Sequence, residues 1–152
     1  PPPVYRWLAE QPGREPIVHL PMLDVYGLEK RPAFHESVYM VYSTLHWKPL
    51  VNGYAGIEPK RYVEIRNLAR SFPSDAFLDA LRAVGTRYVI VHRRGYGPFQ
   101  WERLQKGMPE ALASGALREV TKLGNETVYE LGESPADPPS PGGVEARDDR
   151  VP

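Results

Sequence analysis

The sequence predicts a small layered α/β fold, with a mixed and partly parallel sheet, helices on its faces and an antiparallel C-terminal hairpin. Two short apolar runs, 16–22 and 86–92, have the composition of buried strands. Segments with helical spacing of their apolar residues precede both runs, which is typical of α/β architecture. Two strand-like runs flank Gly124-Asn125, a two-residue hairpin signal that predicts the antiparallel edge.

The length of 152 residues favours one domain. We expect the globular part to cover residues 1–132. The remaining stretch, 133–152, is rich in Pro, Gly and charge and has almost nothing to bury, so it is predicted to be disordered. The chain opens with three prolines instead of Met, and we interpret it as a piece of a longer protein whose N-terminal part is missing.

The N-terminal third is predicted to alternate helix, strand and helix. Val4, Trp7 and Leu8 have helical spacing, and the strand at 16–22 follows. The stretch 34–47 is ambiguous, because its β-branched and aromatic content suits a strand while its spacing favours a helix. We favour the helix, whose apolar stripe would comprise Phe34, Val38, Tyr42 and Leu45.

Two helices are predicted in the middle of the chain. The first covers 58–74, with Pro59 in its first turn. Its stripe comprises Tyr62, Ile65, Leu68, Ala69 and Phe72. Ser74 is a suitable N-cap for the second helix, and Gly85 is suited to follow its last turn. The core face of this second helix comprises Phe77, Leu78, Leu81 and Val84.

The C-terminal half contains the clearest strand, 86–92, followed by a helix at 98–115. Gly107 and Pro109 are predicted to bend or break that helix. Its apolar stripe comprises Trp101, Leu104, Met108 and Leu112. We expect 16–22 and 86–92 to be neighbouring parallel strands in the middle of the sheet, with the hairpin at one edge.

Composition excludes several classes of function. Lys plus Arg equals Asp plus Glu, 19 each, which argues against a nucleic-acid binder. The absence of cysteine excludes disulfides, thiolate zinc sites and cysteine nucleophiles. The sequence has no phosphate loop, no dinucleotide fingerprint and no G-x-S-x-G elbow. We therefore expect no cofactor and identify no catalytic constellation.

Three histidines are candidates for a site. His19 and His92 lie near the ends of the two apolar strands, where ligands collect in open parallel sheets, and His46 lies just before a loop. Together they could bind a metal or supply a general base, as in a hydrolase. None of their spacings is a metal signature, however, and a histidine flanked by apolar residues in a strand is usually a hydrogen-bonded core residue. The structural interpretation is therefore favoured.

The stretch "STLHWKPLVNGYAG", residues 43–56, is the densest in polar and aromatic side chains. Aromatic rings beside amide and Lys donors suit a sugar, which stacks on rings and bonds through its hydroxyls. The same residues could instead build a self-packed loop, which we favour, although loops often carry function. The candidate binding residues are His46, Trp47, Lys48, Asn52 and Tyr54, with His19 and His92 nearby.

Residues 4–131 resemble the C-terminal extracytoplasmic domain of large bacterial polytopic membrane proteins of the GT-C glycosyltransferase class. These proteins are similar to dolichyl-phosphate-mannose protein mannosyltransferases. The blocks that carry the resemblance are "STLHWKPLVNGYAG" and "FPSDAFLDALRAVGTRYVIVH". In that family the catalytic carboxylate and the lipid-linked donor site belong to the membrane half, so the resemblance implies that this piece has no catalytic residue of its own.

The resemblance implies a domain on the extracytoplasmic face of the cell membrane. Its partner would be the membrane-embedded half of the parent chain, and a glycan or lipid-linked sugar is a further candidate ligand. The leading alternative is a purely structural scaffold that binds no ligand. A soluble hydrolase that uses the three histidines is the second alternative.

Overall fold

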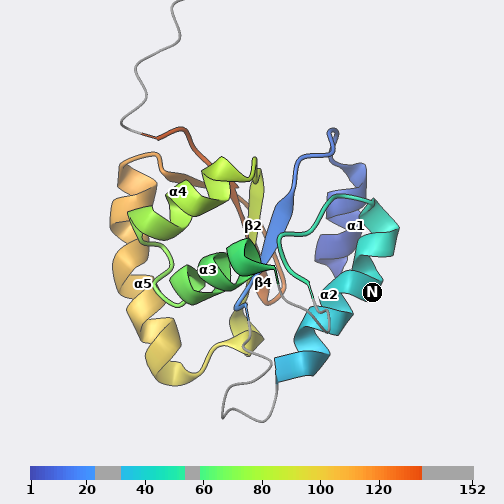
Figure 1. Cartoon of the computed structure of the whole chain (residues 1–152), viewed down its shortest axis with the longest axis horizontal. Helices are drawn as coiled ribbons and strands as arrows, with labels where there is room; N and C mark the ends of the chain where they lie inside the picture. The colour runs from blue at the N-terminus through green and yellow to red at the C-terminus, as the bar shows by residue number, and fades with distance from the viewer. Residues whose placement is uncertain (23–31, 54–58, 135–152) are drawn as a thin grey trace, which may run out of the picture.

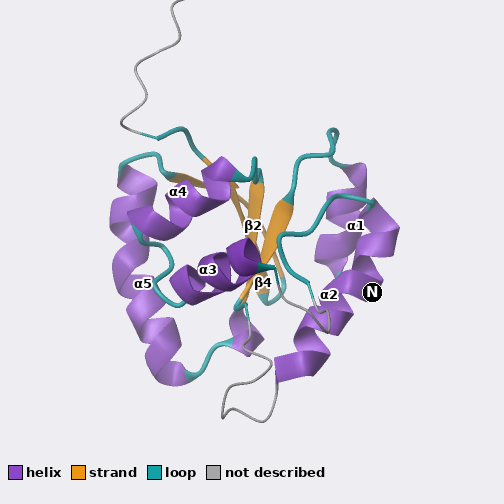
Figure 2. Ribbon diagram, viewed as in Figure 1, coloured by secondary structure: helices purple, strands orange, loops and turns teal. Residues whose placement is uncertain are grey.

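The computed structural model describes residues 1–22, 32–53 and 59–134, with the side chains of 32–35 left out. The order of elements agrees with the predicted order, and the fold is α/β (Figure 2). The helices are α1 (Pro3–Glu10), α2 (Pro32–His46), α3 (Lys60–Ala69), α4 (Asp75–Ala83) and α5 (Pro98–Ala113). The strands are β1 (Ile17–Leu20), β2 (Tyr88–His92), β3 (Leu117–Leu123) and β4 (Glu126–Leu131), and a 3-10 turn, η1 (Arg93–Gly95), follows β2. The predicted tail lies almost entirely outside the described residues.

The four strands form one mixed sheet in the order β1-β2-β4-β3. Strands β1 and β2 are parallel neighbours, as predicted, and the β3–β4 hairpin adds antiparallel strands beyond β2. The prediction that both apolar strands lie in the middle of the sheet is correct only for β2. Strand β1 is the outermost of the four, and in the described part of the segment after α2 an isolated bridge joins Leu50 to Ile17.

Helices cover both faces of the sheet, with α3, α4 and α5 on one side and α1 and α2 on the other (Figure 1). Side chains alternate along each strand, so the two faces feed two cores. Val18, Leu20, Val89 and Val91 join the core beneath α3, α4 and α5. Ile17, Tyr88, Ile90 and Val128 pack with the apolar side chains of α1. This second face is the one that carries the histidines.

Local signals set several boundaries as predicted. The Ser74 hydroxyl accepts a hydrogen bond from the Phe77 amide and caps α4. Gly85 follows α4 with a φ of 74°, and Gly124 in the hairpin turn has a φ of 67°. Both values lie in the left-handed region, which glycine enters without the steric cost that a Cβ imposes.

Helix α5 continues past Pro109 to Ala113, so of the two predicted effects of Gly107 and Pro109 a break does not occur. Two predictions about the buried stripes of helices are wrong. Leu112 is 38% exposed, because the buried face of α5 passes through Leu104, Met108 and Ala111. Leu45 is 45% exposed, because α2 buries Glu36, Tyr39 and His46 instead of its most apolar stripe.

Candidate functional site

Strand register brings His19, His92 and Glu126 to the same face of the sheet. His19 pairs with Ile90 across the parallel ladder, and His92 lies two residues further along β2. On the other side of β2, His92 pairs with Glu126 at the start of β4. Since residues two apart in a strand share a face, the three polar side chains project toward α1 and α2.

The two histidines form a direct hydrogen bond. Nδ1 of His19 lies 2.9 Å from Nε2 of His92, and Nδ1 of His92 lies 3.5 Å from Oε1 of Glu126. His19 has no exposed surface, whereas the His92 side chain is 13% exposed and the Glu126 side chain 16%. The arrangement is therefore a short polar chain that begins at the partly exposed Glu126 and ends at the fully buried His19.

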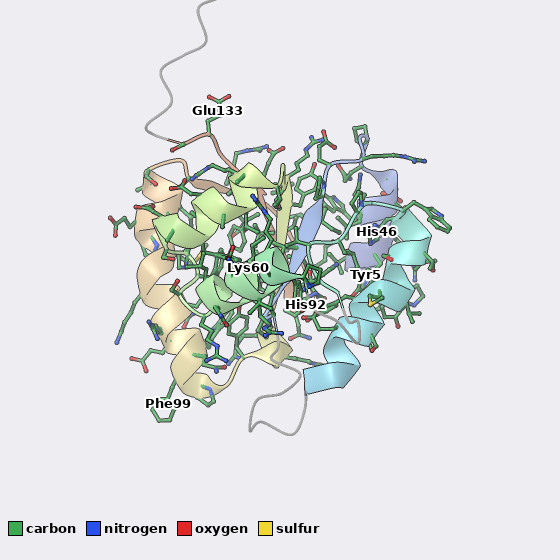
Figure 3. All side chains as sticks on the ribbon, in the orientation of Figure 1. Tyr5, His46, Lys60, His92, Phe99 and Glu133 are labelled. Atoms are coloured by element: carbon green, nitrogen blue, oxygen red, sulfur yellow. The ribbon has the colours of Figure 1, made fainter. Side chains whose placement is uncertain are left out.

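Aromatic rings from α1 and α2 pack against this chain. The Tyr39 ring stacks on both imidazoles, with centroid distances of 4.6 Å to His19 and 5.0 Å to His92. The Tyr5 ring lies 5.6 Å from His19 and 6.4 Å from the parallel ring of His46 (Figure 3). Tyr5 therefore contacts both His19 and His46, and the hydrogen bond between candidate histidines in the described part of the chain joins His19 to His92.

Asn52 links the loop after α2 to the backbone of β1. Its Oδ1 accepts from the His19 amide at 2.6 Å, and its Nδ2 donates to the His19 carbonyl at 2.9 Å. The same Nδ2 lies 3.3 Å from Oε1 of the buried Glu36. The candidate residue Asn52 therefore has a structural role that connects β1, the loop and α2.

Lys48 is likewise used inside the protein. Its Nζ donates to the carbonyls of Gln11 at 2.9 Å and Gly13 at 2.7 Å, and lies 3.5 Å from that of Pro12. These carbonyls belong to the segment that directly follows α1, and Lys48 gives them donors within the protein. The positive charge of Lys48 also interacts favourably with the negative, C-terminal end of the α1 helix dipole.

The other loop candidates differ in their surroundings. The imidazole Nδ1 of His46 accepts a hydrogen bond from the Lys48 amide at 3.1 Å, so its ring closes the C-terminal turn of α2. Trp47 is 72% exposed and has a φ of 54°, a conformation that a residue with a Cβ adopts at a cost. Tyr54 lies outside the described residues.

Burial controls the ionisation of these groups. Burial lowers the pKa of His19 well below its usual value, and the positive charges of His92 and His46 would lower it further. Burial, with a smaller contribution from Lys48, lowers the pKa of His46 to about 4. Burial raises the pKa values of Tyr5 and Tyr39, and nearby carboxylates add to the effect. His19 and His46 are therefore held predominantly neutral around pH 7.

Four participants were missed in the sequence: Tyr5, Glu36, Tyr39 and Glu126. Glu36, Tyr39 and His46 lie at helical spacing on α2, but a polar stripe ordinarily predicts a solvent-facing surface. Glu126 follows the hairpin turn directly, and only the pairing of β4 with β2 brings it to His92. Helical spacing could have revealed the stripe, whereas no local signal reveals the partner strand.

The arrangement does not resemble an open active site. In the described part of the chain, no group of three or more His, Cys, Asp or Glu could hold a metal ion. A groove of about 410 Å³ lies instead beside the β3–β4 hairpin, and its lining includes Arg118, which donates to Glu130. Among the residues described, no helix is both long and apolar enough to cross a membrane.

Comparison with known proteins identifies a related fold. No protein-family model matches the chain, and no curated protein matches its sequence. The chain is similar to a crystal structure of the C-terminal globular domain of an oligosaccharyltransferase from Archaeoglobus fulgidus, with a TM-score of 0.52 and 11% identity. The similarity covers 84% of this chain and 94% of the archaeal domain. At this identity the likeness establishes a shared fold, and it covers nearly the whole of that domain.

Proposed function

We propose that the chain is a non-catalytic accessory domain of a membrane glycosyltransferase of the GT-C class. The observation that carries the proposal is the fold shared with the globular domain of an oligosaccharyltransferase. The sequence resemblance supports the same conclusion, and its two blocks fall on α4–β2 and on the segment that includes Asn52. In this proposal the parent is bacterial, and the domain lies on the extracytoplasmic face of the cell membrane.

The described side chains support the non-catalytic part of the proposal. A general base must reach its substrate, but His19 is fully buried and His92 is already bonded to it. The hydrolase alternative also needs His46 beside the same substrate, but Nδ1 of His46 already accepts a hydrogen bond from the Lys48 amide. We therefore assign the histidines to the architecture of the domain.

The membrane-embedded half of the parent is the proposed partner. Helix α2 and the residue after it expose four large apolar side chains, which could pack against the membrane-embedded half. They are Met40, Val41, Leu45 and Trp47. Burial of such side chains at an interface would be favourable by roughly 25 cal/mol per Å² of apolar area.

The test begins with the gene from which the chain derives. We expect this gene to encode a parent protein with several hydrophobic stretches of about 20 residues before Pro1, each long enough to span a bilayer. In the full-length parent, Val41→Asp and Leu45→Asp are expected to reduce glycosyl transfer without preventing membrane insertion, while Arg103→Asp on the exposed face of α5 has little effect. A parent with a short N-terminus that lacks such stretches would overturn the proposal.

Ligand binding at the loop is a second candidate function, favoured by the exposed indole of Trp47. Lys48 and Asn52 are used within the fold, so a sugar ring would stack mainly on this indole. The test is a fluorescence titration of the chain with oligosaccharides and with lipid-linked sugar analogues. A change that Trp47→Phe abolishes supports binding, while an unchanged spectrum at saturating sugar supports the scaffold alternative.

A further inference from the structure

The hydrogen bond between His19 and His92 joins the two parallel strands directly beneath α2. Tyr39 of α2 stacks on both rings, so the position of this helix depends on the geometry of the pair. The Asn52 amide ties the backbone of His19 to Glu36 of the same helix. A change in the pair is therefore transmitted to α2 through the Tyr39 ring and through Asn52.

The distance of 2.9 Å leaves room for one proton between the rings. In the neutral pair, the favourable arrangement has Nδ1–H of His19 donating to Nε2 of His92. Nδ1–H of His92 then faces the Glu126 carboxylate. The opposite arrangement would place a bare nitrogen against that carboxylate and an Nε2–H on His19, where the buried Nε2 has no hydrogen-bond partner among the described residues.

Acid disrupts this arrangement in either of two ways. A proton added to His92 makes both of its nitrogens donors, so His19 must move its own proton to the buried Nε2. A proton on each ring places two N–H groups against each other at 2.9 Å, and the pair must separate. Glu126 can stabilise one positive charge on His92, but no described carboxylate bonds to the His19 ring.

Every neighbouring element contributes an ionisable group to the surroundings of the pair. These groups are Tyr5 of α1, Glu36, Tyr39 and His46 of α2, Glu126 of β4 and Tyr96 after η1. The three tyrosines are neutral through the acid range, since burial raises their pKa values further above their ordinary value. The Glu126 carboxylate favours a positive charge on His92, and a charge on His46 opposes one on His19.

We propose that the His19–His92 pair is an acid-sensitive latch that releases α2 from the sheet when the pH falls below the ordinary histidine range. The released part comprises α2 and the loop that contains Asn52. The core beneath α3, α4 and α5 lies on the opposite face of the sheet and contains no histidine. It therefore remains folded while α2 opens.

Hydrogen exchange of the 152-residue chain, corrected for intrinsic rates, tests this latch between pH 7.5 and 5. Protection of the amides of 39–46 in α2 is expected to fall by at least about tenfold per pH unit below about 6.5. Protection of α4 is expected to change much less. Equal losses in α2 and α4 would show that acid unfolds the whole domain, and would overturn the proposal.

Two variants separate the contributions of the histidines. His19→Gln retains a neutral amide that can bond His92. In this variant the loss of α2 protection per pH unit is expected to be about tenfold smaller than in the wild-type chain. His46→Gln removes a different titrating group from the same helix, and is expected to leave the contribution of His19 intact. A wild-type response in His19→Gln would overturn the proposal.

A measurement on the wild-type chain keeps the proposal testable if His19→Gln does not fold. Long-range ¹H–¹⁵N spectra of the imidazoles are expected to show His19 as the neutral Nδ1–H tautomer at pH 7.5. A His19 ring that gains a proton near pH 6.5 while α2 keeps its full protection would contradict the latch. The latch would be supported if the neutral tautomer of His19 and the protection of α2 are lost over the same pH range.

Discussion

The side-chain amide of Asn52 pairs with the peptide groups of His19 as another strand would. One hydrogen bond of 2.6 Å runs from the His19 amide to Oδ1, and one of 2.9 Å runs from Nδ2 to the His19 carbonyl. Two backbone bonds precede this pair along the same edge of β1: the Ile17 amide donates to the Pro49 carbonyl, and the Ile17 carbonyl accepts from the Val51 amide. A side chain thus continues a ladder that the backbone of the loop begins.

Replacement of Asn52 is expected to be costly. Asn52→Ala leaves the buried amide and carbonyl of His19 without partners, so the free energy of unfolding should fall by about 2–4 kcal/mol. Asn52→Asp should cost at least as much, because a carboxylate would face the His19 carbonyl and Glu36. Urea denaturation measures both, with exposed Asn67→Ala as the matched control. A loss below about 0.5 kcal/mol in Asn52→Ala would contradict the role described.

Lys48 is expected to stabilise the junction after α1. Lys48→Met retains most of the side-chain volume but removes the three donors, and should lower the free energy of unfolding by about 1.5–3 kcal/mol. Lys122→Met, at an exposed position of β3, should change it by no more than about 0.5 kcal/mol. Thermal and urea unfolding of the two variants provide the comparison, and equal stabilities would argue against the internal role of Lys48.

Phe77 and Phe99 form a matched pair of aromatic residues in helices. Phe77 is fully buried against the edge of Phe72, with ring centroids 5.9 Å apart, whereas Phe99 is 87% exposed. Phe77→Ala should therefore cost about 3–5 kcal/mol, and Phe99→Ala less than about 0.5 kcal/mol. Calorimetric or urea unfolding measures both values. Similar losses in the two variants would refute the assignment of the core beneath α4.

His46 is expected to titrate with a pKa of about 4, which NMR of its ring protons measures directly. Because this value lies below the 6.5 of the unfolded chain, the unfolded state binds more protons between these pH values. The contribution of His46 to stability is thus fully present above pH 6.5, and falls by about 1.4 kcal/mol per pH unit as the pH decreases toward 4. His46→Gln should flatten this dependence, and a ring that titrates near 6.5 would contradict the buried environment.

Elements with local signals could be predicted from the sequence. Helix α4 has its cap at Ser74, its apolar stripe and its glycine at 85, all within a dozen residues. Strand β2 is an unbroken apolar run because both of its faces are covered. The parallel pairing of β1 with β2 also follows, since a helix-containing connection between two buried strands favours it.

The candidate site depends on contacts between distant segments, and the sequence shows them only in part. His19 and His92 were placed near each other because the ends of parallel strands meet at one edge. The contact between Glu126 and His92 could not be predicted from the sequence, because it depends on which strand the hairpin joins. Helix α2 was expected to bury Leu45, but its polar stripe faces the histidine pair and the Asn52 amide, where hydrogen bonds and ring stacking compensate for burial.

The Asn52 pairing also bears on whether a second molecule can add a strand to this edge of the sheet. The outward N–H and C=O groups of β1 belong to Ile17 and His19, and all four have partners within the chain. A strand from another molecule can therefore find no donor or acceptor along this edge. The opposite edge, β3, exposes Arg118, Glu119 and Lys122, and charges of this kind discourage the intermolecular strand addition from which aggregates grow.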